Sequence, residues 1–187
     1  MTTTSSTALY DIPVSKIDGA AATLREHAGE VLLIVNVASK CGLTPQYAVL
    51  EALQERYGAR KFSVLGFPAN DFGGQEPGTN AEIREFCTTK FGVQFPMYGK
   101  IGVTGAQKHP LYRFLIEQQP DTEDRLRMET SLRNYKMEPT PRPEVIWNFE
   151  KFLVSRKGNV VRRFAPDTVP DAAQLIAAIE AELAETI

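Results

Sequence analysis

Cys41 lies on the turn that follows a strongly apolar segment, and it is the residue of this chain best placed for nucleophilic chemistry. Residues 31–35 are apolar, β-branched and too few for a helix, so they predict a buried strand. Thr44 and Pro45 follow as the predicted N-cap and first position of a helix. The Cys41 thiol is therefore expected near amide donors and the positive end of a helix, conditions that lower a thiol pKa.

The spacing around Cys41 argues against several other uses of a cysteine. Thr44 stands where a Cys-x-x-Cys oxidoreductase carries its second thiol. Peroxiredoxins place proline and threonine seven and three residues before the reactive cysteine, where this chain has isoleucine and alanine. His27 and His109 are expected at the surface, which disfavours a Cys–His protease dyad. Clustered Cys and His residues are too few for zinc or iron–sulfur binding, so neither a metal nor a cofactor is expected.

Length and composition indicate one globular domain spanning residues 1–187. An apolar content of 43% is ordinary for such a domain, and a net charge of −2 suggests neither a nucleic-acid nor a membrane partner. Residues 1–7 are polar and are expected to be flexible, with no secretion signal. No apolar run has the length needed to cross a bilayer. Two cysteines do not make a disulfide scaffold, so a reducing cytoplasmic location is expected.

Hydrophobic periodicity and turn residues predict a succession of elements. Residues 79–82 form a capping-box pattern that begins a helix, and residues 120–143 are rich in proline and charge and predict an exposed insertion. The predicted strands cover residues 9–14, 31–35, 62–67, 145–155 and 160–164. The predicted helices cover residues 45–57, 80–91, 109–119 and 170–185.

This order of elements predicts an α/β protein with a thioredoxin-like fold. The first two buried strands are joined by a helix and should run parallel, whereas the hairpin turn at residues 156–159 should make the closing strands antiparallel. The expected architecture is a mixed central sheet with helices on both faces.

Three segments of the sequence together resemble the signature motifs of the glutathione peroxidase family. They are the Cys41 turn, the loop FPANDFGGQEPG at residues 67–78, and WNFEKFL at residues 147–153. The resemblance extends from about Leu9 to Leu183 and keeps the order of the motifs.

The resemblance implies an active site made of the peroxidatic Cys41 with Gln75, Trp147 and Asn148. The last three side chains are uncharged and can donate N–H hydrogen bonds. Donors aimed at a sulfur favour the thiolate, and they can stabilise the oxyanion that develops as a peroxide O–O bond breaks.

The second cysteine, Cys87, falls on the predicted helix at residues 80–91. From its spacing alone it is a buried hydrophobe. The resemblance instead implies a resolving thiol, since members that use thioredoxin carry one on this helix. The implied cycle forms a Cys41–Cys87 disulfide that thioredoxin reduces, and it requires the helix to unwind or shift.

The sequence departs from the family pattern at several points. Ala69 replaces a cysteine common in many members, and Asp71 stands where glutamine is frequent. The insertion at residues 120–143 is similar to that of larger, oligomeric members that bind glutathione. Basic residues near the hairpin could attract glutathione carboxylates, although a solvated basic face is the simpler interpretation: Lys151, Arg156, Lys157, Arg162 and Arg163.

The sequence therefore predicts a peroxidase that reduces hydrogen peroxide and organic hydroperoxides and serves the response to oxidative stress. Thioredoxin is the expected reductant, and direct reduction by glutathione is the alternative within the enzyme class. A redox sensor that passes a Cys41–Cys87 disulfide to a partner protein is the alternative outside it. The sequence leaves the oligomeric state open.

Overall fold

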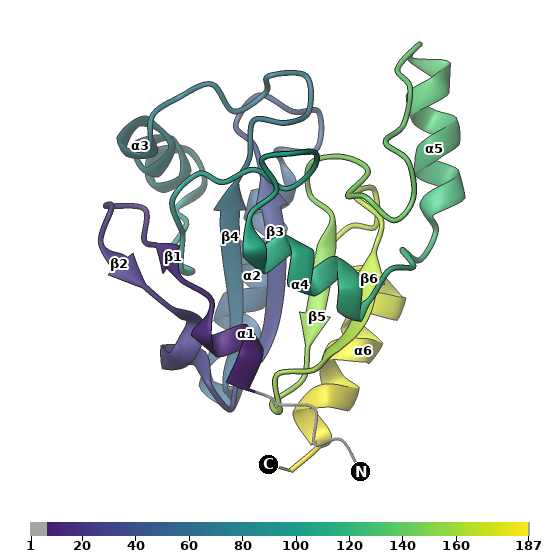
Figure 1. The fold of residues 1–187 in the computed structure, drawn as a ribbon. Coiled ribbons are helices and arrows are strands. Elements are labelled where there is room, and N and C mark those ends of the chain that lie inside the picture. The colour runs from purple at the N-terminus through teal and green to yellow at the C-terminus, as the bar shows by residue number, and fades with distance from the viewer. Residues whose placement is uncertain (1–6, 187) are drawn as a thin grey trace.

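The computed structural model describes residues 7–186, whose centre is a four-stranded sheet in the order β4-β3-β5-β6 (Figure 1). β3 and β4 run parallel and β5 and β6 run antiparallel, as the sequence predicts, and β5 is also antiparallel to β3. Two short strands pair separately as a small antiparallel sheet. The strands are β1 Val14–Ser15, β2 Ala21–Ala22, β3 Val31–Val37, β4 Phe62–Pro68, β5 Lys151–Val154 and β6 Val160–Phe164.

β3 lies inside the sheet between β4 and β5, and all seven of its residues are buried because both of its faces are covered. Val31, Leu33 and Val35 pack into one hydrophobic cluster, whereas Leu32 and Ile34 pack into a second on the opposite face. Alternate side chains of a strand point to opposite faces, so a strand buried on both faces is apolar at almost every position, here all but Asn36. This explains the uninterrupted apolar run that precedes Cys41.

Helices cover both faces of the sheet, as predicted (Figure 1). Residues of α2, α3 and α6 belong to the first cluster, and residues of α1 and α4 belong to the second. The helices are α1 Thr7–Asp11, α2 Gln46–Tyr57, α3 Asn80–Phe91, α4 Pro110–Gln118, α5 Arg125–Asn134 and α6 Ala173–Ala184, with short 3₁₀ turns η1 Leu24–His27 and η2 Gly58–Arg60. Within residues 7–186, no helix has the length and apolar character to cross a membrane.

Helix α3 begins and ends as its sequence indicates. The Thr79 hydroxyl accepts a hydrogen bond from the Glu82 amide, and the Glu82 carboxylate accepts one from the Thr79 amide, which completes the predicted capping box. Gly92 ends the helix with a φ of +62°, a conformation in which a side chain is unfavourable.

Two predicted strands differ from the observed structure. Residues 9–11 belong to helix α1, where Leu9 and Tyr10 pack into the second cluster, and a strand is present only from Val14. The predicted strand at residues 145–155 is ordered as a strand only from Lys151. Its first half is an irregular turn in which Phe149 has a φ of +69°.

The sequence predicts that the insertion at residues 120–143 is exposed, but the structure buries part of it. It contains helix α5, which lies at one end of the sheet (Figure 1). One side of α5 buries Arg125, Met128 and Leu132, while Leu126 on the other side is 66% exposed. Residues 1–6 of the predicted flexible start lie outside the described residues.

Candidate active site

Cys41 sits on a turn that Thr44 holds in place. The Thr44 hydroxyl accepts a hydrogen bond from the Cys41 amide at 3.0 Å and donates one to the Ala38 carbonyl at 2.8 Å. Helix α2 begins one residue later than predicted, with Pro45 at the N-cap, so Thr44 shapes the turn instead of capping the helix. The Leu43 amide lies 3.3 Å from the Cys41 sulfur and donates to it. This is one of the amide donors expected near the thiol.

Gln75 reaches the Cys41 turn through its backbone. Its carbonyl accepts a hydrogen bond of 3.0 Å from the Lys40 amide, which ties the two loops together. Gly73 and Gly74, just before it, have φ angles of +64° and +61°, so the loop needs glycine there. Asp71, which replaces the frequent glutamine, accepts a hydrogen bond from the Val103 amide at 2.9 Å. This position therefore anchors the loop to a neighbouring segment.

The Trp147–Asn148 segment is held by a polar residue of the central strand. The Asn36 side chain donates to the Trp147 carbonyl at 3.1 Å, and the Asn36 carbonyl accepts from the Phe149 amide at 2.6 Å. Asn148 is fully buried and donates to the Gln75 side-chain oxygen at 2.9 Å. Asn36 was not predicted as a site residue. A polar side chain inside a strand that is otherwise apolar is the signal that could have found it.

Three of the four predicted active-site side chains meet at one cavity. Cys41, Gln75 and Trp147 line a cavity of about 390 Å³, whereas Asn148 lies behind Gln75 and contacts it. Asn148 engages the amide oxygen of Gln75, which leaves the Gln75 NH₂ group free of this contact and available as a donor. The arrangement can therefore present N–H donors to an anion formed at the sulfur.

The opposite wall of this cavity comes from the insertion and was missed from the sequence. Met128, Leu132, Tyr135 and Met137, on and just after α5, line the cavity together with Ser131. The apolar pattern of the segment is blurred, because Leu126 on the other side of α5 is apolar and yet 66% exposed. Only the folded chain shows that α5 covers the Cys41 turn.

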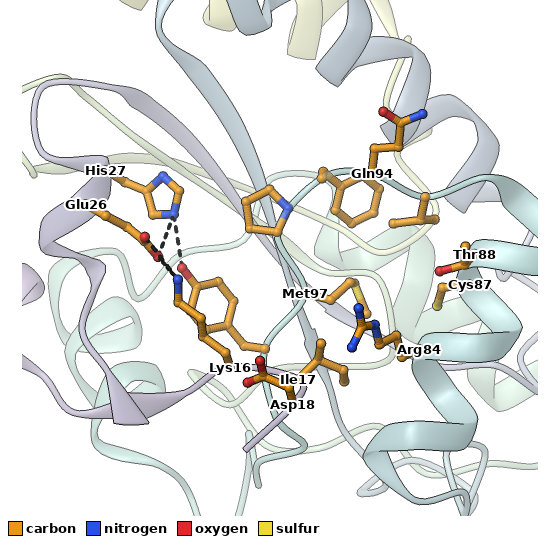
Figure 2. A pocket seen from close by; sticks show the side chains of 14 residues that line it. Lys16, Ile17, Asp18, Glu26, His27, Arg84, Cys87, Thr88, Gln94 and Met97 are labelled. Atoms are coloured by element: carbon orange, nitrogen blue, oxygen red, sulfur yellow. Dashed lines mark hydrogen bonds and ion pairs between the residues drawn. The ribbon is translucent and has the colours of Figure 1, made fainter. Parts of the chain in front are cut away.

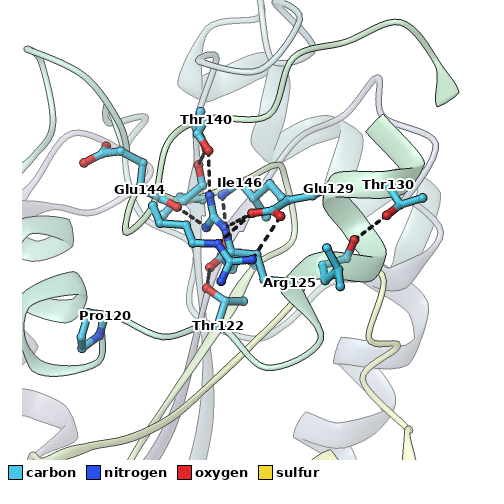
Figure 3. Close-up of polar contacts among 12 residues, drawn as sticks. Pro120, Thr122, Arg125, Glu129, Thr130, Thr140, Glu144 and Ile146 are labelled. Carbon is cyan, nitrogen blue, oxygen red and sulfur yellow. Dashed lines mark hydrogen bonds and ion pairs between the residues drawn. The ribbon is translucent and has the colours of Figure 1, made fainter. Parts of the chain in front are cut away.

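Buried Arg125 fixes α5 in this position (Figure 3). Its guanidinium donates to the Glu129 carboxylate at 2.9 Å and to the carbonyls of Glu144 and Thr140 at 2.6 and 2.8 Å. Arg142 adds two hydrogen bonds to Glu129, both at 3.1 Å. These contacts join both ends of the insertion, so the cavity wall is a positioned part of the structure.

Cys87 is not part of the Cys41 cavity. It is 1% exposed and lines a separate cavity of about 410 Å³, where it lies across from Met97 and near Arg84 (Figure 2). Burial raises the pKa of its thiol to about 11, with a smaller contribution from Glu76 and an opposing one from the Tyr47 hydroxyl. Both cysteines are free thiols. The structure therefore keeps the two thiols in different cavities.

The histidines and the basic residues differ in part from the sequence interpretation. His27 is buried and contacts the Tyr98 hydroxyl at 3.1 Å, so the prediction of a surface histidine was wrong. His109 caps α4 by accepting from the Leu111 amide. Lys151 and Arg163 are fully buried, which contradicts a uniformly solvated basic face. Across residues 7–186, no group of Cys, His, Asp and Glu side chains could hold a metal ion.

Lys151 binds the loop that carries Trp147. Its ammonium group donates to the carbonyl of Phe149 at 2.6 Å and to that of Pro166 at 3.0 Å. Burial lowers the Lys151 pKa from 10.5 to about 7, and the carboxylates of Glu150 and Asp167 oppose this shift. A lysine that loses its proton so readily makes stability depend on pH.

Replacing Lys151 with Met should remove this dependence. Between pH 7 and about 10.4 the unfolded lysine binds more protons than the folded one, so the stability of the unaltered protein rises with pH in that window. From pH 7 to pH 9 its free energy of unfolding should rise by about 2 kcal/mol relative to Lys151→Met. Urea unfolding of both proteins at the two pH values measures the difference. Parallel curves would show that the buried amine does not titrate as stated.

Comparisons with known proteins agree with this fold. The structure of T. cruzi GPX1 matches with a TM-score of 0.68 and 30% identity, covering 94% of this chain and 95% of that one. The fold is thus the thioredoxin-like fold of thiol peroxidases, as predicted. The family model described as glutathione peroxidase matches residues 9–116.

Two similar proteins cover almost the whole chain. Thioredoxin/glutathione peroxidase BtuE of Escherichia coli is 47% identical, over 92% of this chain and 95% of its own length. Hydroperoxy fatty acid reductase gpx1 of Synechocystis is 43% identical, over 91% and 94%. The chain belongs to the glutathione peroxidase family, whose members are peroxidase oxidoreductases. The family resemblance of the three sequence motifs is confirmed.

Proposed function

We propose that this protein reduces hydroperoxides through Cys41. The observation that carries the proposal is the shared cavity of Cys41, Gln75 and Trp147, with the Leu43 amide donating to the sulfur. The Cys41 thiolate attacks one peroxide oxygen and the O–O bond breaks. The sulfur becomes a sulfenic acid, and the leaving oxygen takes up a proton as water or an alcohol.

Neighbouring side chains have different proposed roles in stabilising the thiolate and the departing oxygen. The Gln75 amide and the Trp147 indole are the proposed donors to the thiolate and to the departing oxygen. Asn148 acts one step removed, because its hydrogen bond engages the Gln75 oxygen and leaves the Gln75 NH₂ group available as a donor. We therefore assign Asn148 a positioning role.

Cys87 is the proposed resolving thiol, which attacks the sulfenic acid of Cys41 to form a disulfide and release water. Helix α3 must open for this, because the two thiols lie in different cavities. The helix is suited to opening: only Ile83 and Cys87 of its residues are buried. Cavities of about 620 and 470 Å³ flank it on other sides. Few buried apolar contacts mark a segment of low local stability.

The variant Cys87→Ser tests this step. One equivalent of peroxide should still oxidise Cys41, but no intramolecular disulfide should form, and thioredoxin-coupled turnover should fall to roughly a few per cent. Mass spectrometry of the oxidised protein and NADPH consumption with thioredoxin and its reductase measure the two effects. Thr89→Ala, exposed on the same helix, is the matched control. Unchanged turnover in Cys87→Ser would reject the resolving role.

Thioredoxin is the proposed reductant, and a disulfide between two protein thiols is the form that it reduces. The name of the E. coli relative includes both thioredoxin and glutathione. Supplying each donor system in turn to the protein with peroxide and comparing NADPH consumption separates the two. Faster turnover with glutathione and its reductase would assign that donor instead.

Organic hydroperoxides are proposed as substrates besides hydrogen peroxide. Leu43, Met128, Leu132 and Trp147 give the Cys41 cavity apolar walls that suit a hydrocarbon substituent. The Synechocystis relative is named a hydroperoxy fatty acid reductase. Two free thiols suit a reducing compartment, so we propose a cytoplasmic location. Because the proposed reaction removes hydroperoxides, we also propose a part in the response to oxidative stress.

A further inference from the structure

Glu76 is a buried carboxylate with no ion pair to account for it. The residue is 1% exposed, and within residues 7–186 neither carboxylate oxygen accepts a hydrogen bond of normal geometry. Lys100 donates to the backbone carbonyl of Glu76 at 2.8 Å, and the Asn70 side chain accepts from its amide at 2.9 Å. The backbone is thus held firmly, whereas among the described residues the carboxylate has only the Ser39 hydroxyl and amide close to it, neither in normal hydrogen-bond geometry.

Such a group is costly to the fold. A buried acceptor without a partner destabilises the folded state, and a charged one does so more. Glutamine or an apolar residue of the same size would avoid much of this cost. Unpaired buried titratable groups of this kind are concentrated at functional sites.

The place of Glu76 connects it with both cysteines. It follows Gln75 and lines a cavity of about 470 Å³ between the Cys41 turn and helix α3. From the turn, Ser39 and Lys40 line this cavity just before Cys41. From the helix, Ile83 and Phe86 line it, and Phe86 immediately precedes Cys87. Glu76 thus borders the two segments that carry the cysteines.

We infer that Glu76 carries the proton of the resolving step; this inference rests on the function proposed above. The carboxylate accepts the proton of the Cys87 thiol as that sulfur attacks the sulfenic sulfur of Cys41. The S–S bond forms and the S–O bond of the sulfenic acid breaks. Glu76 then returns the proton to the departing hydroxide, which leaves as water. Each sulfur keeps its bond to its own Cβ, and the step needs no external oxidant or reductant.

The acid–base properties of the two groups fit these roles. While α3 is closed, with a pKa of about 11, Cys87 is thiolate to only about one part in 10⁴ at pH 7, so a base is needed to take its proton as the helix opens. Burial raises the pKa of Glu76, which makes it a stronger base than an exposed carboxylate. Ser39 and the charges of Lys100 and Lys40 oppose this rise.

The test separates the two chemical steps in Glu76→Gln. One equivalent of peroxide is mixed with the reduced protein, dimedone traps the Cys41 sulfenic acid at successive times, and mass spectrometry follows the Cys41–Cys87 disulfide. We expect Cys41 oxidation within about twofold of the unaltered rate. Disulfide formation should slow by about 10²–10⁴-fold, the usual contribution of general acid–base catalysis. Glu85→Gln, exposed on α3, is the matched control and should change neither rate.

Two further measurements distinguish proton transfer from a structural effect. Disulfide formation in Glu76→Gln should speed up about tenfold per pH unit as pH rises toward the pKa of Cys87, whereas the unaltered protein should show a weaker dependence. In Glu76→Ala, added formate should restore part of the rate. A Glu76→Gln protein that forms the disulfide at the unaltered rate would overturn the inference.

Failure of the underlying proposal gives different results. If peroxide leaves Cys41 of the unaltered protein unoxidised, Cys41 is not the peroxidatic residue. If Cys41 is oxidised but no Cys41–Cys87 disulfide forms, Cys87 is not the resolving thiol. Either result also removes the role of Glu76. An unaltered disulfide rate in Glu76→Gln removes that role alone.

Discussion

Cys41→Ser should abolish hydroperoxide reduction, lowering the rate by at least about 10³-fold, to the level of the buffer. Serine preserves the size of the side chain, but its hydroxyl does not ionise near neutral pH, so no nucleophile of comparable strength remains. The fold should persist, because the turn is held by Thr44 and by the backbone contact between Lys40 and Gln75. Peroxide consumption and thermal unfolding measured on the same sample check both statements.

Cys87→Ser is the natural comparison for this variant, since it should retain one round of peroxide reduction. If Cys41→Ser kept even a tenth of the peroxidase rate, another group would have to be the nucleophile. The Cys41 cavity and its N–H donors would then need a different explanation.

Arg163→Met should cost about 3–5 kcal/mol of folding free energy, the usual penalty for leaving one charge of a buried pair alone. Arg163 and Glu150 are both fully buried, and the guanidinium Nε lies 2.5 Å from the carboxylate. The same carboxylate accepts from the Ile146 amide at 2.7 Å, which spans the turn that carries Trp147. The variant should therefore weaken the active-site turn together with the fold.

Urea unfolding of two further variants shows how much of this loss comes from the unpaired buried charge. Glu150→Gln combined with Arg163→Met should recover part of the stability, because no buried charge is then unpaired. Arg162→Met on the same strand breaks a half-exposed pair with Glu123 and should cost at most about 1 kcal/mol. Equal losses for Arg162→Met and Arg163→Met would contradict the importance given to burial.

The sequence predicted well those elements whose signals are local. Apolar runs predict β3 and β4, and a capping box and a terminal glycine predict α3. These features can be recognised from the sequence because each depends on only a few neighbouring residues. The sequence failed at residues 9–14 and 145–150. There, tertiary packing of Leu9 and Tyr10 and the contacts of Glu150 override a short alternating pattern.

The sequence by itself was enough to predict the family, the fold and which two cysteines to consider for the chemistry, since local motifs and their order carry that information. Only the tertiary structure decided that Asn148 supports Gln75, that α5 walls the Cys41 cavity and that Glu76 lies buried between the two thiols' segments. These relations join residues far apart in the chain. They depend on which side chains packing brings into contact, and no pattern along the sequence records that.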